Sequence, residues 1–154
     1  MAMLKKGDKI PAISLKNDEG AWVDLSQHLG KDNLVVYFYP KNNTPGCTAE
    51  ACEFRDHFDD FAEAGFIIYG ISGDSENSHQ QFKRRYKLNF NLLSDGHRKA
   101  EKAFGVSRNL FGLLPGRVTF VINKEGIIEH VFDSALNPKK HIHEALKKVQ
   151  KSRN

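Results

Sequence analysis

Two continuous apolar runs of strand length mark the first half of the chain. Leu34–Tyr39 and Phe66–Ser72 lack the polar alternation of a strand that has one solvated face. This pattern predicts central strands of a parallel sheet whose two faces are both covered. Pro40 directly follows the first run and is expected to end that strand.

Apolar residues at helical spacing occupy the stretch between these two strands. Phe54, Phe58 and Phe61 recur on one helical face, so a helix is predicted from Pro45 to Gly65. The remaining elements are shorter. They are a hairpin of Ile13–Leu15 and Ala21–Leu25, a polar helix over Ser75–Tyr86, a strand over Asn91–Leu93, a helix over His97–Phe104, a hairpin of Arg117–Ile122 and Ile127–Phe132, and a C-terminal helix from about Pro138.

The order of these elements indicates the fold class. A hairpin is followed by β-α-β-α-β-α and then by β-β-α. Strands that alternate with helices predict an α/β layered domain with a parallel core. The closing hairpin and helix favour a thioredoxin-like fold with an N-terminal β-hairpin extension. The length of 154 residues suits one domain, so residues 1–154 are expected to form a single domain.

Composition and charge narrow the class of protein. Apolar residues make up 40% and charged residues 27%, as in an ordinary globular protein. Part of the net charge of +4 comes from Lys139, Lys140, Lys147, Lys148, Lys151 and Arg153. We interpret this run as the solvated face of a helix, and the alternative is weak, salt-dependent attraction to an anionic partner. Specific binding of nucleic acid is not expected.

The chain shows no secretory leader, and its apolar runs are too short to cross a bilayer. The expected location is therefore the cytoplasm, without a membrane partner. In that compartment two cysteines are more often reactive or metal-binding than joined in a permanent structural disulfide.

The candidate chemistry lies between Tyr39 and Arg55, where a buried strand leads through a loop into a helix. Thr44 fits the N-cap position, and Pro45 fits the first helical position because it needs no N–H donor there. Cys47 then lies in the first turn. Unpaired N–H groups and the positive end of the helix dipole favour a thiolate there, and the thiolate is the nucleophilic form.

The spacing of the two cysteines leaves alternatives open. Cys47 and Cys52 could be only small buried residues of a helix. A metal site is not favoured, because Cys-x₄-Cys is not a usual zinc spacing and no second pair completes four ligands. His141 and His143 are two residues apart on a predicted helix and should point in different directions.

The pattern Pro40-x₃-Thr44-x₂-Cys47 resembles the active-site signature of peroxiredoxins. The fuller run from Asn43 to Cys52 is similar to their bacterioferritin-comigratory, or Q-type, branch. Further matches follow in the family's order along the whole chain, at Gly70-Ile71-Ser72, Leu93-Ser94-Asp95 and Gly116-Arg117-Val118-Thr119-Phe120.

This resemblance implies a role for each matching residue. Cys47 would attack the O–O bond of a hydroperoxide and become a sulfenic acid. Thr44 would contact the peroxide and the thiolate, and Pro40 would shield the sulfur from solvent. Arg117 would stabilise the thiolate and the leaving oxygen, while Glu50 would hold Arg117 in place. Each role also has a simpler interpretation. Thr44 could be only a helix cap and Pro40 only a strand end. Arg117 could be a surface charge, and Glu50 could be an ordinary acid in the first turn of the helix.

Cys52 resembles the resolving cysteine of members that place it five residues after the peroxidatic one. It would form an intramolecular disulfide with Cys47, which thioredoxin or glutaredoxin would reduce. Resolution by an external thiol is the alternative. The resemblance implies no metal, haem, flavin or bound nicotinamide. No further cysteine could form an intersubunit disulfide, which favours a monomer.

Two other functions remain open. A thiol–disulfide oxidoreductase would also need reactive cysteines, but such enzymes normally use Cys-x-x-Cys. A redox-regulated holdase or interaction module would use the cysteines as a sensor. The apolar residues of Leu110–Leu114, with Phe104, could form a collar for alkyl hydroperoxides, a docking surface for a reductase, or core packing. Asn42, an apparent departure from the family, is not expected to touch the chemistry.

Overall fold

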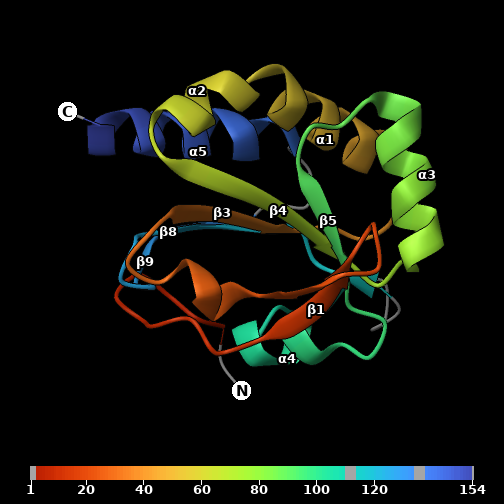
Figure 1. Ribbon diagram of the computed structural model, residues 1–154, viewed down its shortest axis with the longest axis horizontal. Helices are drawn as coiled ribbons and strands as arrows, with labels where there is room; N and C mark the ends of the chain where they lie inside the picture. Colours follow the sequence, from red (N-terminus) through yellow and green to blue (C-terminus); the bar gives the residue numbers. More distant parts are fainter. Residues whose placement is uncertain (1–2, 110–113, 134–137, 154) are drawn as a thin grey trace.

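The computed structural model describes residues 3–109, 114–133 and 138–153 (Figure 1). The strands are β1 (Ser14–Asn17), β2 (Trp22–Asp24), β3 (Asn33–Phe38), β4 (Phe66–Ser72), β5 (Asn91–Ser94), β6 (Arg108–Asn109), β7 (Leu114–Pro115), β8 (Val118–Ile122) and β9 (Ile128–Asp133). The helices are α1 (Pro45–Asp56), α2 (Phe58–Glu63), α3 (Glu76–Tyr86), α4 (Lys99–Phe104) and α5 (Pro138–Arg153), and a 3₁₀ turn, η1, covers Leu25–His28.

One mixed sheet of order β2-β1-β5-β4-β3-β8-β9 forms the centre of the molecule. Strands β3, β4 and β5 are parallel, and β8 runs antiparallel to β3. The predicted parallel core and both predicted hairpins are therefore confirmed. The N-terminal hairpin extends the sheet, because β1 pairs with β5.

Side chains of β3 alternate between two hydrophobic clusters, one on each face of the sheet. Val35 and Tyr37 belong to the cluster covered by α1, α2, α3 and α5. Val36 and Phe38 belong to the cluster covered by α4 and by the segment before β1. Figure 1 shows these two layers above and below the sheet. Burial on both faces explains why this strand has no polar alternation.

The helix predicted from Pro45 to Gly65 is wrong as one unit, because α1 ends at Asp56 and α2 begins at Phe58. His57 between them has φ −103° and ψ 12°, and its N–H donates to the carbonyls of Arg55 and Glu53. The break leaves Phe54 and Phe61 in one apolar cluster. Apolar spacing therefore continues through a backbone break that it does not predict.

The short ribbon of β6 and β7 and the turn η1 were not predicted from the sequence. In the part of the chain that the structure describes, no helix is both long and apolar enough to span a bilayer.

Candidate active site

Helix α1 begins where the loop after β3 ends, at the carboxyl edge of the parallel strands. Thr44 occupies the N-cap position with φ −87° and ψ 151°, and Pro45 follows as the first helical residue. The N–H of Thr48 donates to the Thr44 carbonyl at 2.9 Å, which closes the first turn. Cys47 lies in this turn and is 1% exposed.

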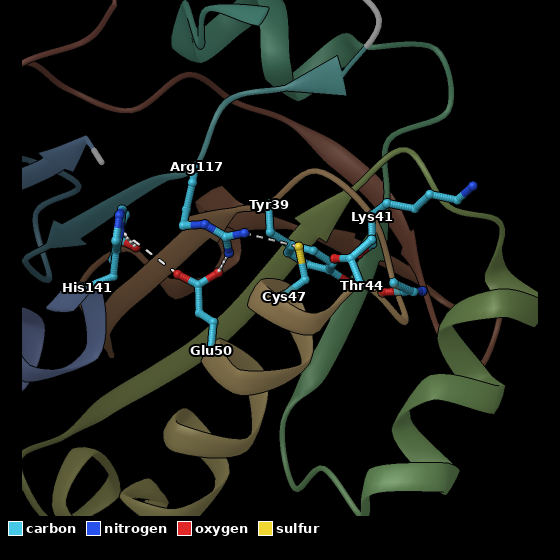
Figure 2. Close-up of polar contacts among 9 residues, drawn as sticks. Tyr39, Lys41, Thr44, Cys47, Glu50, Arg117 and His141 are labelled. Atoms are coloured by element: carbon cyan, nitrogen blue, oxygen red, sulfur yellow. Dashed lines mark hydrogen bonds and ion pairs between the residues drawn. The ribbon is translucent and has the colours of Figure 1, made fainter. Parts of the chain in front are cut away.

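The hydroxyl of Thr44 does not cap the helix, contrary to one interpretation of the sequence. It donates instead to the carbonyl oxygen of Lys41 at 2.9 Å. The structure therefore leaves the first-turn N–H groups of α1 without a side-chain cap from Thr44. Such groups favour an anion at the helix start, and Cys47 lies beside them. Figure 2 shows Thr44 next to the sulfur.

Arg117 joins two groups of α1 through its guanidinium (Figure 2). Its Nη2 donates to the Cys47 sulfur at 3.3 Å, and its Nη1 donates to Glu50 Oε1 at 2.5 Å. Arg117 directly precedes β8, whose Val118 pairs with Phe38 at the end of β3. This pairing brings a residue distant in sequence to the start of α1.

A second polar layer lies behind Glu50. His141 Nδ1 in α5 lies 3.9 Å from Glu50 Oε2 and 2.9 Å from the hydroxyl oxygen of Thr119 in β8. His141 is 1% exposed, whereas the side chain of His143 is 66% exposed. The two histidines therefore point in different directions, as their spacing predicts. Among the described residues no group of three His, Cys, Asp or Glu side chains could hold a metal ion.

Burial and charge act against each other in the Glu50–Arg117 pair. Burial raises the pKa of Glu50 to about 8, although the charge and hydrogen bond of Arg117 act in the opposite direction. Burial acts to lower the pKa of Arg117, but the neighbouring Glu50 and Cys47 outweigh it and raise that pKa. Arg117 is therefore a fixed cation, and Glu50 is the member of the pair that titrates near neutral pH.

Cys52 lies in the same helix but is not bonded to Cys47, and both are free thiols. Cys47 is buried and Cys52 is only partly buried. Five residues of an α-helix separate two Cα atoms by about 8–9 Å, which exceeds the span of a disulfide. The structure thus brings Cys47, Glu50 and Arg117 together, but not the two cysteines.

Pro40, another predicted site residue, lies in the loop between β3 and α1.

Comparison with known proteins assigns this arrangement to a family. The AhpC/TSA family profile matches residues 6–131. The chain belongs to the AhpC/TSA family. Among its relatives, chloroplastic peroxiredoxin Q of Sedum lineare is 49% identical over 149 residues, which cover 97% of this chain and 80% of that protein. Chloroplastic peroxiredoxin Q of Suaeda salsa is 47% identical over 150 residues, which cover 97% and 70%.

Solved structures give the same assignment. Peroxidoxin BcpB of Mycobacterium tuberculosis is 35% identical, with a TM-score of 0.89 and coverage of 96% of this chain and 97% of that one. A mutant of Xylella fastidiosa PrxQ is 27% identical, with a TM-score of 0.89 over all of both chains. The resemblance to Q-type peroxiredoxins and the thioredoxin-like fold are confirmed, and the chain is a peroxidase enzyme.

The expected cytoplasmic location is wrong. The finding that contradicts it is that the relatives from Sedum lineare, Oryza sativa, Suaeda salsa and Arabidopsis thaliana are all chloroplastic proteins. A leader-like pattern, or its lack in a given sequence, does not determine the compartment.

Sequence reasoning missed five polar residues around this peroxidase site. Tyr39, Asn42 and His79 form a buried network beside the loop before α1, and Thr119 and His141 lie behind Glu50. Asn42 is 4% exposed, although no role is predicted for it from the sequence. Its place inside the signature, between Pro40 and Thr44, is the available signal.

The proposed apolar collar falls mostly on residues that the structure does not describe. Positions 110–113 and the side chain of Leu114 lie outside the described part of the chain. Phe104 is fully buried and packs against Phe38 and Phe120 in the core. For Phe104 the core interpretation is therefore the correct one.

Proposed function

We propose that this peroxidase uses Cys47 as its peroxidatic thiolate and Cys52 as its resolving thiol, and that thioredoxin recycles it. The observation that supports this most strongly is the 3.3 Å hydrogen bond from Arg117 Nη2 to the Cys47 sulfur in the first turn of α1. A fixed cation and a helix N-terminus at one buried sulfur both favour its ionised, nucleophilic form.

In the first step the Cys47 thiolate attacks the terminal oxygen of a hydroperoxide, ROOH. An S–O bond forms as the O–O bond breaks, which gives a sulfenic acid and RO⁻, and RO⁻ takes a proton from solvent. Arg117 stabilises the negative charge as it moves from sulfur to the leaving oxygen. Glu50 holds the guanidinium in place, Thr44 contacts the peroxide, and Pro40 limits solvent access.

In the second step the Cys52 sulfur, as a thiolate, attacks the sulfenic sulfur of Cys47. The disulfide forms and hydroxide leaves, which is protonated to water. The dithiol of thioredoxin then reduces this disulfide and becomes oxidised itself. Each cycle converts ROOH and a dithiol into ROH, water and a disulfide.

Hydrogen peroxide and organic hydroperoxides are the proposed substrates. The bacterioferritin comigratory protein of Xanthomonas campestris, 28% identical with a TM-score of 0.83, has alkyl peroxide reduction activity, which supports the organic class. We also propose that residues 1–154 form one domain and act as a monomer, which light scattering of the reduced protein would test.

A coupled assay tests the proposal. The protein is mixed with hydrogen peroxide or cumene hydroperoxide, thioredoxin, thioredoxin reductase and NADPH, and a parallel reaction contains glutaredoxin and glutathione. Peroxide-dependent oxidation of NADPH with thioredoxin is expected, and mass spectrometry should find Cys47 joined to Cys52. If peroxide is consumed only with glutaredoxin, thioredoxin is not the reductant.

Two controls separate the alternative functions. A thiol–disulfide oxidoreductase would reduce the disulfides of insulin in the absence of peroxide. A redox-regulated holdase would suppress aggregation of a client protein when oxidised and would lose that activity on reduction. Either activity, in a protein that consumes no peroxide, would contradict the proposed mechanism.

A further inference from the structure

A buried hydrogen-bond network lies beside the loop that leads into the active site. The Tyr39 hydroxyl donates to Asn42 Oδ1 at 2.6 Å, and Asn42 Nδ2 lies 3.0 Å from His79 Nδ1. His79 Nε2 lies 3.1 Å from the carbonyl oxygen of Leu93 in β5. His79 is completely buried in α3, and neither the first nor the second step of the peroxidase reaction uses it.

The partners of His79 determine its protonation state. A carbonyl oxygen can only accept, so Nε2 carries the proton that is donated to Leu93. In a neutral imidazole Nδ1 is then an acceptor, and it receives a hydrogen bond from the amide NH₂ of Asn42. The Asn42 oxygen is left to accept from Tyr39. Every contact is satisfied with His79 neutral.

Asn42 fixes the active-site loop through its backbone as well as its side chain. Its N–H donates to Asp74 Oδ2 at 2.9 Å, and its Nδ2 also lies 3.1 Å from the hydroxyl oxygen of Ser78 in α3. The preceding residue, Lys41, supplies the carbonyl that accepts from the Thr44 hydroxyl. Asn42 therefore anchors the residue next to the carbonyl that holds the Thr44 hydroxyl at the start of α1.

We propose that His79 is a positioning residue for peroxide reduction. In its neutral form it holds the Asn42 amide, and through it the loop from Pro40 to Thr44, in the arrangement that places Thr44 beside Cys47. Protonation of His79 would disturb that arrangement and slow the attack on peroxide. The inference rests on the proposed role of Cys47 as the peroxidatic residue.

Protonation of His79 would place two hydrogen-bond donors opposite each other. A proton on His79 Nδ1 would point at the NH₂ group of Asn42, which lies nearer to Nδ1 than the Tyr39 hydroxyl oxygen does, at 3.0 Å against 3.4 Å. This contact between two donors would favour a turn of the Asn42 amide. Tyr39 would then lose its acceptor and Ser78 its donor, and these groups are buried or partly buried. An unsatisfied buried polar group is destabilising, so the loop would shift to a position in which these groups regain partners.

Burial and the neighbouring charges shift the pKa of His79 in opposite directions. Burial lowers the pKa of His79 below its usual value of 6.5, while the carboxylates of Asp74 and Asp18 act to raise it. Lys83 of α3 neutralises part of the Asp18 charge through an ion pair at 3.2 Å. Because the net direction is downward, His79 is neutral at pH 7, and the disturbed state is reached only in acid.

The test is the pH dependence of the first oxidation of Cys47, followed between pH 4.5 and 8 by rapid mixing with hydrogen peroxide, quenching and mass spectrometry. A reaction that requires one deprotonated group has a slope of about one in the logarithm of the rate against pH on the acid side. We expect the parent protein to fall more steeply in acid, with a slope that approaches about two. Circular dichroism at each pH confirms that the protein remains folded.

His79→Asn retains an acceptor near the position of Nδ1 but cannot be protonated. It should keep the rate at pH 7.5 within about threefold and lower the acid slope to about one. His28→Asn is the matched control, because His28 is also buried but bonds to Asp32 and Tyr69, away from the loop. This control should keep the steep acid limb.

Asn42→Asp gives an independent check if His79→Asn does not fold. A carboxylate at position 42 accepts from protonated His79 and from Tyr39, so the acid form of the network is satisfied and the slope should also fall to about one. Equal acid slopes in the parent and both variants would overturn the positioning role. If the parent protein itself leaves Cys47 unoxidised by peroxide, the proposed function fails instead.

Discussion

Cys47 and Cys52 lie five residues apart in one helix, yet their surroundings differ in every respect that governs thiol chemistry. Cys47 is buried in the first turn of α1 and receives a hydrogen bond from Arg117. Cys52 lies in the middle of α1 and is partly exposed. The N-terminal end of a helix carries unpaired N–H groups and the positive end of the dipole, whereas the helix interior does not. The position in the fold, not the residue type, therefore supports the proposal that Cys47 is the thiol that attacks the peroxide.

The largest expected effect on peroxide reduction comes from replacing the sulfur of each cysteine with the oxygen of serine. Cys47→Ser should abolish peroxide reduction completely, because the nucleophile is lost. Cys52→Ser should still reduce about one equivalent of peroxide and then stop as a sulfenic acid, unless another thiol resolves it. Peroxide consumed per protein, with mass spectrometry of the product, gives the measurement. Sustained turnover by Cys47→Ser would show that the two roles are wrongly assigned.

The next largest effect tests the cation that distinguishes the two thiols. Arg117→Ala should slow the oxidation of Cys47 by about 10²–10³, the usual cost of losing one preorganised donor to a developing oxyanion. Arg117→Lys should restore only part of the rate, because lysine lacks the planar fork that contacts sulfur and carboxylate together.

Arg108→Ala is the matched control for this experiment. Arg108 also pairs with a buried glutamate, Glu101, at 2.7 Å, and this ion pair includes no cysteine. Its loss should change the rate of peroxide reduction by less than about threefold. If Arg117→Ala behaves like Arg108→Ala, the guanidinium does not take part in the reaction.

A third experiment tests whether the two positions in α1 can meet without a change of backbone. Helical geometry places their Cα atoms about 8–9 Å apart, and a disulfide requires about 7 Å or less. Oxidation should therefore unwind the first turns of α1, and amide exchange across residues 45–54 should accelerate by about tenfold or more. Exchange in α3 serves as the internal reference. Unchanged protection of α1, with the disulfide confirmed by mass spectrometry, would contradict this expectation.

The sequence predicted the parts of this fold that depend on local periodicity. Continuous apolar runs indicated β3 and β4 because both faces of the central sheet are covered. The break at His57 was missed because Phe54 and Phe61 keep helical spacing across it and enter the same cluster. Periodicity reports which side chains are buried, and it does not report whether the backbone between them is continuous.

The candidate site likewise combines a feature that the local sequence predicts with long-range contacts that it does not predict. The place of Cys47 in a first turn follows from the local order of Thr44 and Pro45. The contact of Arg117 with Glu50 joins residues 67 apart, and only the family resemblance suggested it. The contact of Asn42 with His79 joins residues 37 apart and had no local pattern at all. Polar contacts between distant elements depend on strand order, which single-sequence patterns do not supply.

The smallest expected effect concerns the carboxylate behind the reactive thiol. Burial raises the pKa of Glu50 from 4.5 to about 8. Between these two values the folded protein holds a proton that the unfolded chain has released, so this group makes stability fall as pH rises. Its favourable contribution is fully present below about pH 4.5 and is lost as pH rises through about 8.

Glu50→Gln removes this titration and retains an oxygen that can accept from Arg117. The free energy of unfolding, measured by urea denaturation of the reduced protein between pH 5 and 8, should therefore decline less with pH in the variant than in the parent. The two slopes should differ by at most about 1.4 kcal/mol per pH unit, the value for one proton. Glu19→Gln, at an exposed turn position, is the control and should leave the parental slope unchanged. Parallel curves for Glu50→Gln and the parent would mean that Arg117 keeps Glu50 ionised throughout, so that burial does not govern this site.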